Sequence, residues 1–279
     1  MSSPTDVTPA LLREWGLPDP GDSKKSRGRV MVVGGSRRSP GAVLLAGEAA
    51  LRVGAGRLGL VVSASVEGQL GVQMPEAAVL PLPERATDPI EGGLREELAS
   101  ADAVLVGPGF DDADETRDTL LAIADAGLSC LVLDAYALGV LPGIDRGRLP
   151  ATLMLNPNVE EAAILLEREP GEDRVADLVE IARRYDAVVN CYGLVVTAAG
   201  ESWNVPGGGP GLGTSGSGDV LAGAIAGFAA RGVDAARAAV WGSWAHARAG
   251  DRLTERTGIG FLAREIPPEL TLAVREALG

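Results

Sequence analysis

The sequence contains almost no lysine and a single histidine. Its two lysines, Lys24 and Lys25, lie near the N-terminus, so arginine carries nearly all of the positive charge. A Walker-type phosphate loop needs a lysine after its glycines, and none is available for one. The single histidine, His246, excludes a zinc site built from several histidines and leaves no other histidine to activate a nucleophile. Because it lies in an Ala- and Trp-rich stretch predicted to be helical, we expect a core or helix-face role for it.

Cysteine is equally scarce, and no apolar run is long enough to cross a bilayer. Cys130 and Cys191 each lie in an apolar run that predicts a buried strand. Two such thiols indicate no disulfide framework and suit a reducing compartment. The first residues lack the charged and apolar regions of a secretion signal. We therefore expect a soluble, cytoplasmic protein with no membrane partner.

The chain is strongly acidic, with a formal net charge of −13 at pH 7. Such a charge argues against nucleic acid or an anionic membrane as a partner. Hydrophobic residues make up 46% of the 279 residues and aromatic residues only 4%, so a core of Ala, Val and Leu is expected. No linker divides the chain, which predicts one domain over residues 1–279 that begins with a polar leader at 1–27.

Short apolar segments alternate with helical patterns along most of the chain. Strands are predicted at 29–34, 57–63, 103–106, 130–134, 152–155 and 187–190, with helices ending near 53 and at about 115–126, from 159 and at 175–185. This alternation predicts an α/β fold with a mostly parallel sheet covered by helices on both faces. Residues 194–205 predict a hairpin around Gly200 and Glu201, and the C-terminal region is predicted to be helical to Leu278.

The most informative motif is a loop of glycine and hydroxyl residues that precedes an apolar helix. Residues 213–219 read GTSGSGD, and 220–228 carry apolar residues that suit one helix face. Such a loop can direct several backbone N–H groups at one point, which predicts an anion site, most simply for phosphate. Asp219 would repel phosphate, so we expect it to take a proton from a hydroxyl or to reach a metal. The alternative is that Asp219 only complements the helix dipole.

Gly-, Ser- and Asp-rich segments also follow several predicted strands, namely those ending at Gly34, Val106, Leu133 and Leu155. Ligands of open α/β sheets bind at the carboxyl ends of the strands, so we expect these segments and the glycine loop to form one cleft. In the first segment Ser36 is favoured as a ligand contact, whereas Arg37 and Arg38 are expected to be solvated. Asn158 and Glu161 have the spacing of a helix capping box.

A second glycine motif, GAGRLG at 54–59, fits the dinucleotide-binding fingerprint only by its letters. That fingerprint requires a strand before it and a helix after it, and here the order is reversed. Gly54 or Gly56 is better explained as the glycine that ends the preceding helix.

Five segments occur in a fixed order from about Arg29 to Leu278. They read VVGGS…PGAVLLAGEAALRVGAGRLGLVV, LVGPGF, LDAYAL, NPNVEEAAILL and GPGLGTSGSGDVLAGAIAGFAARG…HARAGD. Together they resemble the ADP/ATP-dependent NAD(P)H-hydrate dehydratases, a branch of the ribokinase-like superfamily. The GGS…PGA…GAG and GTSGSGDVLAG blocks make the combination specific. The resemblance implies a ribokinase-like fold with a small hairpin before the glycine loop.

The resemblance implies an enzyme that repairs NADH or NADPH after water has added across a double bond of the nicotinamide ring. ADP or ATP, with Mg²⁺, would phosphorylate the hydroxyl of the (6S) hydrate and so make it a good leaving group. Asp219 would deprotonate that hydroxyl, and the N–H groups of Gly216, Ser217 and Gly218 would stabilise the transferred phosphoryl group. The lone pair of the ring nitrogen would then expel phosphate.

The resemblance also implies the residues that bind each ligand. The hydrate pocket would be lined by Ser36, Ala42, Gly109, Asn158 and Asp219. The nucleotide pocket would be lined by Tyr192, Gly193, Val195, Val196, Thr214, Gly216, Ser217 and Gly218. No residue is assigned as a metal ligand, and a homo-oligomer, tetramer or dimer, is expected.

Three positions depart from the family pattern. The usual Thr-Pro-His is Asn-Pro-Asn at 156–158, which replaces a histidine expected near the hydrate with Asn158. The usual Asp-Ala-Asp becomes Asp134-Ala-Tyr136, and the usual Lys-Gly becomes Tyr192-Gly193. Asn158 can serve as a helix cap or a ligand contact, and Asp134 as a loop hydrogen-bonding group or a site carboxylate. Two other functions stay open: a kinase for another alcohol, and a nucleotide-binding paralogue with weakened or lost catalysis.

Overall fold

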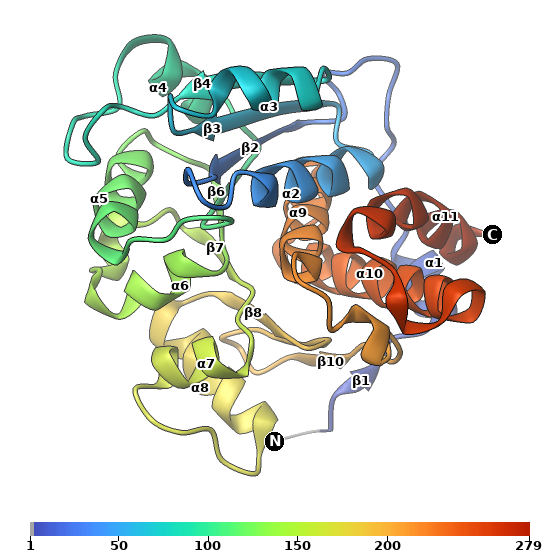
Figure 1. Ribbon diagram of the computed structural model, residues 1–279. Helices are drawn as coiled ribbons and strands as arrows, with labels where there is room; N and C mark the ends of the chain where they lie inside the picture. Colours follow the sequence, from blue (N-terminus) through green and yellow to red (C-terminus); the bar gives the residue numbers. More distant parts are fainter. Residues whose placement is uncertain (1–2) are drawn as a thin grey trace.

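Strands that are apolar on both sides place a large sheet at the centre of the molecule. The computed structural model describes residues 3–279 (Figure 1). Its strands form one ten-stranded sheet in the order β1-β10-β9-β8-β7-β6-β5-β2-β3-β4. The strands are β1 (Thr5–Asp6), β2 (Arg29–Gly34), β3 (Arg57–Val62), β4 (Ala77–Pro81), β5 (Ala103–Val106), β6 (Cys130–Leu133), β7 (Thr152–Leu155), β8 (Val188–Cys191), β9 (Leu194–Val196) and β10 (Ser202–Asn204). From β8 to β4 all neighbours are parallel, whereas β9 is antiparallel to both β8 and β10.

Helices cover both faces of the sheet, as the sequence predicts. In β2, Val30 and Val32 enter one core and Met31 and Val33 enter the other, and all four are fully buried. The helices on the first face are α1 (Pro9–Trp15), α2 (Gly41–Arg52), α3 (Glu67–Gln73), α9 (Ser217–Ala230), α10 (Ala235–Thr257) and α11 (Ile266–Leu278). Those on the second face are α4 (Gly92–Ala99), α5 (Ala113–Ala124), α6 (Tyr136–Val140), α7 (Val159–Leu166) and α8 (Arg174–Tyr185). Short 3-10 helices complete the set: η1 (Leu141–Gly143), η2 (Arg146–Arg148), η3 (Pro210–Leu212), η4 (Gly258–Gly260) and η5 (Ala263–Glu265).

The predicted strands and the predicted hairpin are confirmed. β2, β3, β5, β6, β7 and β8 start and end within one residue of the predicted positions, and β9 and β10 form the hairpin. The GAGRLG segment lies between α2 and β3, and the Gly54 N–H donates to the carbonyl of Leu51, as expected for a helix end. Among residues 3–279, no helix combines the length and the apolar character that crossing a bilayer requires.

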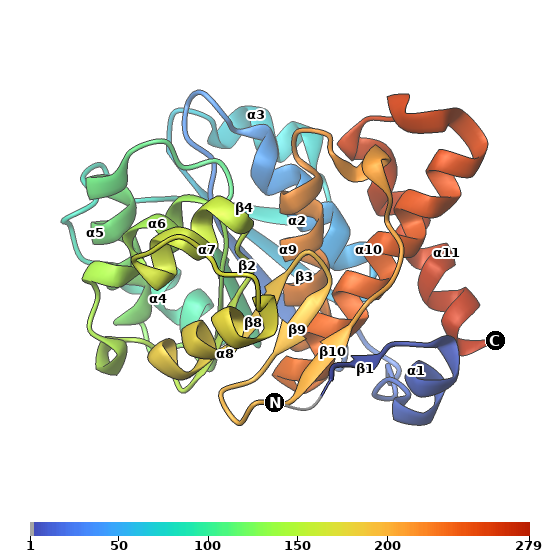
Figure 2. The same ribbon diagram turned by 90° about the horizontal axis from the view of Figure 1, so that it is seen from below.

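The two outermost strands, β1 and β4, were not predicted. β1 has only two residues and pairs with β10, where the side-chain amide of Asn204 donates to Asp6 (2.8 Å). The helix that follows, α1, lies next to β1 (Figure 2). It buries Leu12 completely and places Trp15 edge-on to Trp203 of β10. Part of the expected polar leader is therefore structured and covers one edge of the sheet, while its residues 1–2 lie outside the described residues.

Two helices of the first face, α2 and α9, pack backbone against backbone. A Cβ atom placed at Gly223 would lie 2.1 Å from the carbonyl oxygen of Ala46, and one at Gly227 would lie 2.7 Å from that of Ala50. Any side chain at these two positions of α9 would force the helices apart. The glycines therefore set how closely the helix after the glycine loop approaches the helix after β2.

Candidate active site

A cavity of about 260 Å³ opens beside the glycine loop. Its walls come from the loops after β6 and β7, the turn between β8 and β9, and the start of α9. The lining residues are Asp134, Ala135, Asn156, Pro157, Asn158, Glu161, Tyr192, Gly216, Gly218, Asp219 and Leu221. The expected meeting of strand-end segments with the glycine loop is confirmed for β6 and β7.

The start of α9 offers free backbone donors to this cavity. Gly216 is the N-cap, with φ +91°, and the helix begins at Ser217. Within the described chain, the N–H groups of Gly216, Gly218 and Asp219 donate to no protein atom, as is usual in a first helical turn. The Ser217 N–H, in contrast, donates to the Thr214 carbonyl (3.1 Å), so it is not free to face a phosphate. The donors available to an anion are therefore those of Gly216, Gly218 and Asp219.

The Ser217 side chain does not line the cavity either. Its hydroxyl lies 3.0 Å from Nε2 of His246, and both side chains are buried. Burial lowers the pKa of His246 to about 4, so the imidazole is neutral at pH 7. The predicted core role of the only histidine is confirmed.

Asp219 lies at the opening of the amide pocket and lines the cavity. Burial, followed by the charge of Glu161, raises its pKa to about 6. A carboxylate with this pKa is still mostly ionised at pH 7, yet it accepts a proton more readily than an ordinary aspartate. Asp219 is therefore suited to act as a general base beside an anion site.

A buried chain of polar side chains ends at a second carboxyl group, that of Asp134. The Ser243 hydroxyl donates to Oδ1 of Asn190 (2.8 Å), and Asn190 Nδ2 donates to Oδ1 of Asn156 (2.7 Å). Asn156 Nδ2 in turn donates to Oδ1 of Asp134 (3.0 Å). Burial, with a further contribution from the charge of Asp219, raises the pKa of Asp134 well above its usual range. The chain connects α10, β8 and the loops after β7 and β6, and it fixes Asp134 in the cavity wall.

The role of Asp134 is open from the sequence alone, and the other members of this chain were not predicted. The only signal was a polar residue, Asn190, at the end of an otherwise apolar strand. Ser243 lies within α10, and its position in the sequence gives no sign of its hydrogen bond to Asn190 on β8.

Asn158 serves as the N-cap of α7, as its spacing predicted. Its Oδ1 accepts the Glu161 N–H (2.8 Å), and Glu161 Oε2 accepts the Asn158 N–H (2.9 Å). The amide Nδ2 of Asn158 donates to none of the described residues, and the side chain lines the cavity. The cap leaves this amide group available to a ligand.

The turn between β8 and β9 presents one nucleotide-pocket residue and buries two others. Tyr192 and Gly193 both have positive φ (+48° and +77°), the pattern of a two-residue type I′ turn. The Tyr192 side chain is 69% exposed and lines the cavity. Val195 and Val196, however, are fully buried in β9 between β8 and β10, where their side chains support the turn.

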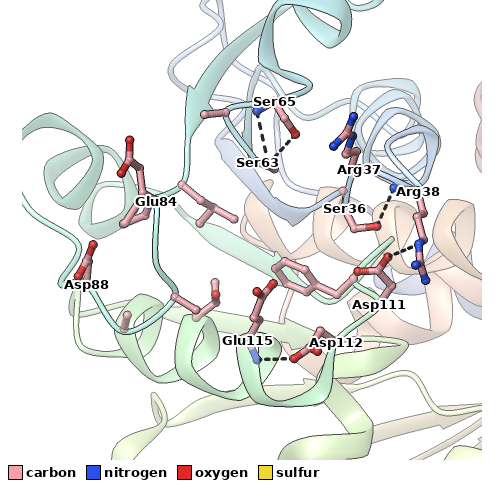
Figure 3. Close-up of a pocket in the computed structure, with 18 of the residues that line it drawn as sticks. Ser36, Arg37, Arg38, Ser63, Ser65, Glu84, Asp88, Asp111, Asp112 and Glu115 are labelled. Carbon is pink, nitrogen blue, oxygen red and sulfur yellow. Dashed lines mark hydrogen bonds and ion pairs between the residues drawn. The ribbon is translucent and has the colours of Figure 1, made fainter.

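Ser36, Ala42 and Gly109 lie together at the divider between the Asp219 cavity and a second cavity, and none of them lines the Asp219 cavity. The Ser36 N–H donates to the Gly109 carbonyl (2.8 Å), and a Cβ atom at Gly109 would lie 3.0 Å from that of Ala42. Ser36 lines a second cavity of about 1010 Å³, shown in Figure 3, which Asp219 does not line. The expectation of one cleft is therefore wrong: the loops after β5 and β2 separate two cavities.

Comparison with known proteins agrees with this geometry. Residues 30–271 match the family model described as NAD(P)H-hydrate dehydratase. The chain is 47% identical over 274 residues to the ADP-dependent (S)-NAD(P)H-hydrate dehydratase of Xanthomonas campestris pv. campestris, with 95% of this chain and 94% of the relative covered. It is 35% identical to the bifunctional NAD(P)H-hydrate repair enzyme Nnr of Moorella thermoacetica, with 90% of this chain and 52% of the relative covered. The chain thus spans about half the length of that bifunctional relative.

Solved structures show the same fold at lower sequence identity. An ADP/ATP-dependent NAD(P)H-hydrate dehydratase from Bacillus subtilis, co-crystallized with ATP/Mg²⁺, superposes with a TM-score of 0.85 at 24% identity, covering 99% of each chain. A ribokinase-like superfamily protein from Enterococcus faecalis gives a TM-score of 0.82 at 24% identity, covering 98% of this chain and 96% of that one. The fold is ribokinase-like, as expected. With the family match over most of its length, the chain belongs to the NAD(P)H-hydrate dehydratase family.

Proposed function

We propose that this protein converts (6S)-NAD(P)H hydrate back to NAD(P)H and consumes ADP or ATP in the reaction. The observation that carries the proposal is Asp219, a carboxylate with a pKa raised to about 6, next to the free N–H groups of Gly216 and Gly218. A general base beside an anion site is what phosphorylation of a hydroxyl requires. ADP is the favoured donor because the Xanthomonas relative is named as ADP-dependent.

Phosphorylation is the first step of the proposed reaction. The hydroxyl oxygen on ring carbon 6 attacks the terminal phosphoryl group of the nucleotide while its proton passes to Asp219. The bond between the terminal phosphorus and the bridging oxygen of the nucleotide breaks, so ADP yields AMP and ATP yields ADP. The N–H groups of Gly216 and Gly218 donate to the phosphoryl oxygens, on which negative charge accumulates.

Elimination is the second step. The lone pair of the ring nitrogen forms a double bond to carbon 6 as the carbon–oxygen bond breaks and phosphate departs. A proton must then leave carbon 5, so that its bonding electrons restore the ring double bond and the nitrogen recovers its lone pair. Asp134 lines the same cavity and would accept this second proton. Two carboxylates thus divide the two proton transfers between them.

Binding of the two ligands is proposed for the residues that line the cavity or its divider. Asn158, Ala42 and Gly109 would contact the hydrate, and Ser36 would extend that surface into the larger cavity. Tyr192, Gly193 and Thr214 would flank the nucleotide beside the amide groups of α9. Val195 and Val196 would act only by holding the turn in place.

The donor set of the cavity fits Mg²⁺. This ion takes oxygen ligands, typically one or two carboxylates together with substrate phosphates. Glu161 lines the cavity and would hold the ion together with the nucleotide phosphates, which leaves Asp219 free to accept a proton. When bound, Mg²⁺ would offset negative charge on the nucleotide phosphates.

The proposal is tested by adding purified protein to NADH hydrate with ADP or ATP and Mg²⁺, and following the absorbance of reduced nicotinamide. Recovery of that absorbance, lost in Asp219→Ala while nucleotide binding by calorimetry persists, supports the proposal. Nucleotide consumption with a stable phosphorylated product would favour a kinase for another alcohol. Nucleotide binding without turnover in folded protein would favour the non-catalytic paralogue.

Three broader features belong to the same proposal. Residues 1–279 would act as one catalytic domain, in the cytoplasm, and as a dimer or tetramer. Light scattering after size-exclusion chromatography tests the oligomeric state directly.

A further inference from the structure

The larger cavity lies at the same edge of the sheet as the proposed active site. It is lined by residues that follow β2, β3, β4 and β5, among them Ser36, Ser63, Leu82 and Phe110. The active-site cavity is lined by residues that follow β6 and β7. Since β6, β5, β2 and β3 are consecutive neighbours, the two cavities lie side by side along the carboxyl ends of the strands.

The spacing between the two cavities matches an elongated ligand. From β6 to β3 there are three strand intervals, or roughly 14 Å at about 4.8 Å each. The divider between them is made of Gly109 and Ala42, and the Ser36 N–H donates to Gly109 on the larger-cavity side. These are the residues proposed to contact the hydrate. A dinucleotide whose reacting ring lies beside Asp219 can therefore extend across the divider into the larger cavity.

Charge is distributed unevenly around this cavity (Figure 3). Arg37 and Arg38 lie on one side beside Asp111, Glu84 and Asp88 lie on the opposite side, and Asp112 and Glu115 lie between them at the start of α5. Within the described chain, Arg37, Glu84 and Glu115 form no ion pair, while Asp88 pairs with Arg85 (2.8 Å) and Arg38 lies 3.9 Å from Asp111. Both arginines are exposed, as expected, and lie at the rim of this cavity.

We propose that the larger cavity binds the adenosine half of the dinucleotide substrate and that it favours the NADH form of the hydrate. This inference rests on the proposed function. Arg37 and Arg38, next to the divider, would bind the diphosphate bridge. Phe110 and Leu82 provide apolar surface for the base.

The preference follows from the carboxylates of the far wall. Acidic side chains accept hydrogen bonds from ribose hydroxyl groups, whereas a 2′-phosphate is normally met by arginine. Glu84 and Glu115 line the larger cavity, so an adenosine ribose bound there would face them, and an additional phosphate would meet two unpaired negative charges. The NADPH form is therefore disfavoured by repulsion.

Three substrates and two variants test this inference. Turnover is measured with NADH hydrate, NADPH hydrate and the hydrate of reduced nicotinamide mononucleotide, which lacks the adenosine half. Binding of the corresponding reduced products is measured by calorimetry. The variants are Glu84→Gln/Glu115→Gln and, as a matched control, Glu76→Gln, an exposed carboxylate at the opposite end of β4.

We expect the wild-type protein to favour NADH hydrate over NADPH hydrate about tenfold in kcat/KM, as two exposed charge contacts allow. The truncated substrate should show a raised KM. In Glu84→Gln/Glu115→Gln the ratio of kcat/KM for NADH hydrate to that for NADPH hydrate should fall to about twofold, because NADPH hydrate is used better. Added salt should also lower this ratio in the wild type. Glu76→Gln should retain the wild-type ratio.

Several results would overturn the inference while leaving the proposed function intact. These are equal use of NADH and NADPH hydrates by the wild type, full activity on the truncated substrate, or a ratio that Glu84→Gln/Glu115→Gln leaves unchanged. No turnover of any hydrate, combined with the expected order of product affinities, would instead reject the activity and retain the cavity as a dinucleotide site. No turnover and no such order of affinities would reject both.

Discussion

The Ser217 hydroxyl and Nε2 of His246 lie 3.0 Å apart in a buried contact that joins the first turn of α9 to α10. Because burial keeps the imidazole neutral, this is a neutral hydrogen bond and no ion pair. Ser217 follows directly after Gly216, whose N–H is one of the free donors of the anion site. The only histidine of the chain therefore supports the glycine loop from behind and does not line the cavity.

His246→Phe should destabilise the fold by about 2 kcal/mol, because it leaves a buried serine hydroxyl without a partner. Ser217→Ala/His246→Phe, which removes both partners, should recover part of that loss. Denaturant unfolding of the two single variants and the double variant measures the coupling between the residues. Strictly additive losses would show that the contact contributes nothing.

Activity should decrease as the pH falls through about 6, because Asp219 must be ionised to accept the hydroxyl proton. The same raised pKa affects stability in the opposite direction. Between the ordinary value of 3.8 and about 6, the folded state binds more protons than the unfolded state, so the stability due to this group decreases as the pH rises.

Asp219→Asn should therefore be inactive, yet more stable than wild type by about 1–2 kcal/mol at pH 8 and no more stable at pH 4. Unfolding curves at both pH values, with pH–rate profiles of the wild type, check both parts. An Asn variant that is less stable at pH 8 would contradict the penalty ascribed to burial of the carboxylate.

Asp134→Asn should separate the two chemical steps. The new amide oxygen can still accept from Asn156 Nδ2, so the buried chain and the fold are retained. Loss of the carboxylate should slow the elimination step by a factor of about 10²–10⁴ while phosphorylation continues. Rapid-quench assays should then show AMP release ahead of NADH formation. Ser243→Ala, at the other end of the chain, serves as the control and should slow both steps equally or neither.

Tyr192→Lys should lower the KM for ADP severalfold, because it places a positive charge at the edge of the cavity beside the amide groups of α9. Added salt should reduce this gain. Tyr192→Gln controls for loss of the aromatic ring without a new charge. Equal KM values for the Lys and Gln variants would place this side chain away from the phosphates.

The sequence predicts the centre of the fold better than its edges. β2 and β5 are buried on both faces, so their unbroken apolar runs are evident in the sequence. β4 is only partly buried and β1 has two residues, and neither gives a periodic signal. Their pairing depends on tertiary contacts, such as Trp15 against Trp203.

The site divides in the same way between local and non-local features. The glycine loop, the position of Asp219 in it and the Asn158 cap depend on residues close together in the sequence. The spacing of those residues was therefore sufficient to predict them. The hydrogen-bonded chain from Ser243 to Asp134 and the wall between the two cavities join residues distant in sequence. No single segment of the chain reports such a contact.

The glycine contacts of α2 and α9 also constrain how the enzyme can move. With Gly223 and Gly227 against the backbone of α2, the two helices can neither slide nor separate without losing close packing. The glycine loop leads into α9 and Ala42 lies in the first turn of α2, so the proposed phosphoryl transfer would take place across a gap that is set before either ligand binds. Any movement that closes the site over the substrate would then involve the surface loops, while the two helices keep the reacting atoms at a fixed separation.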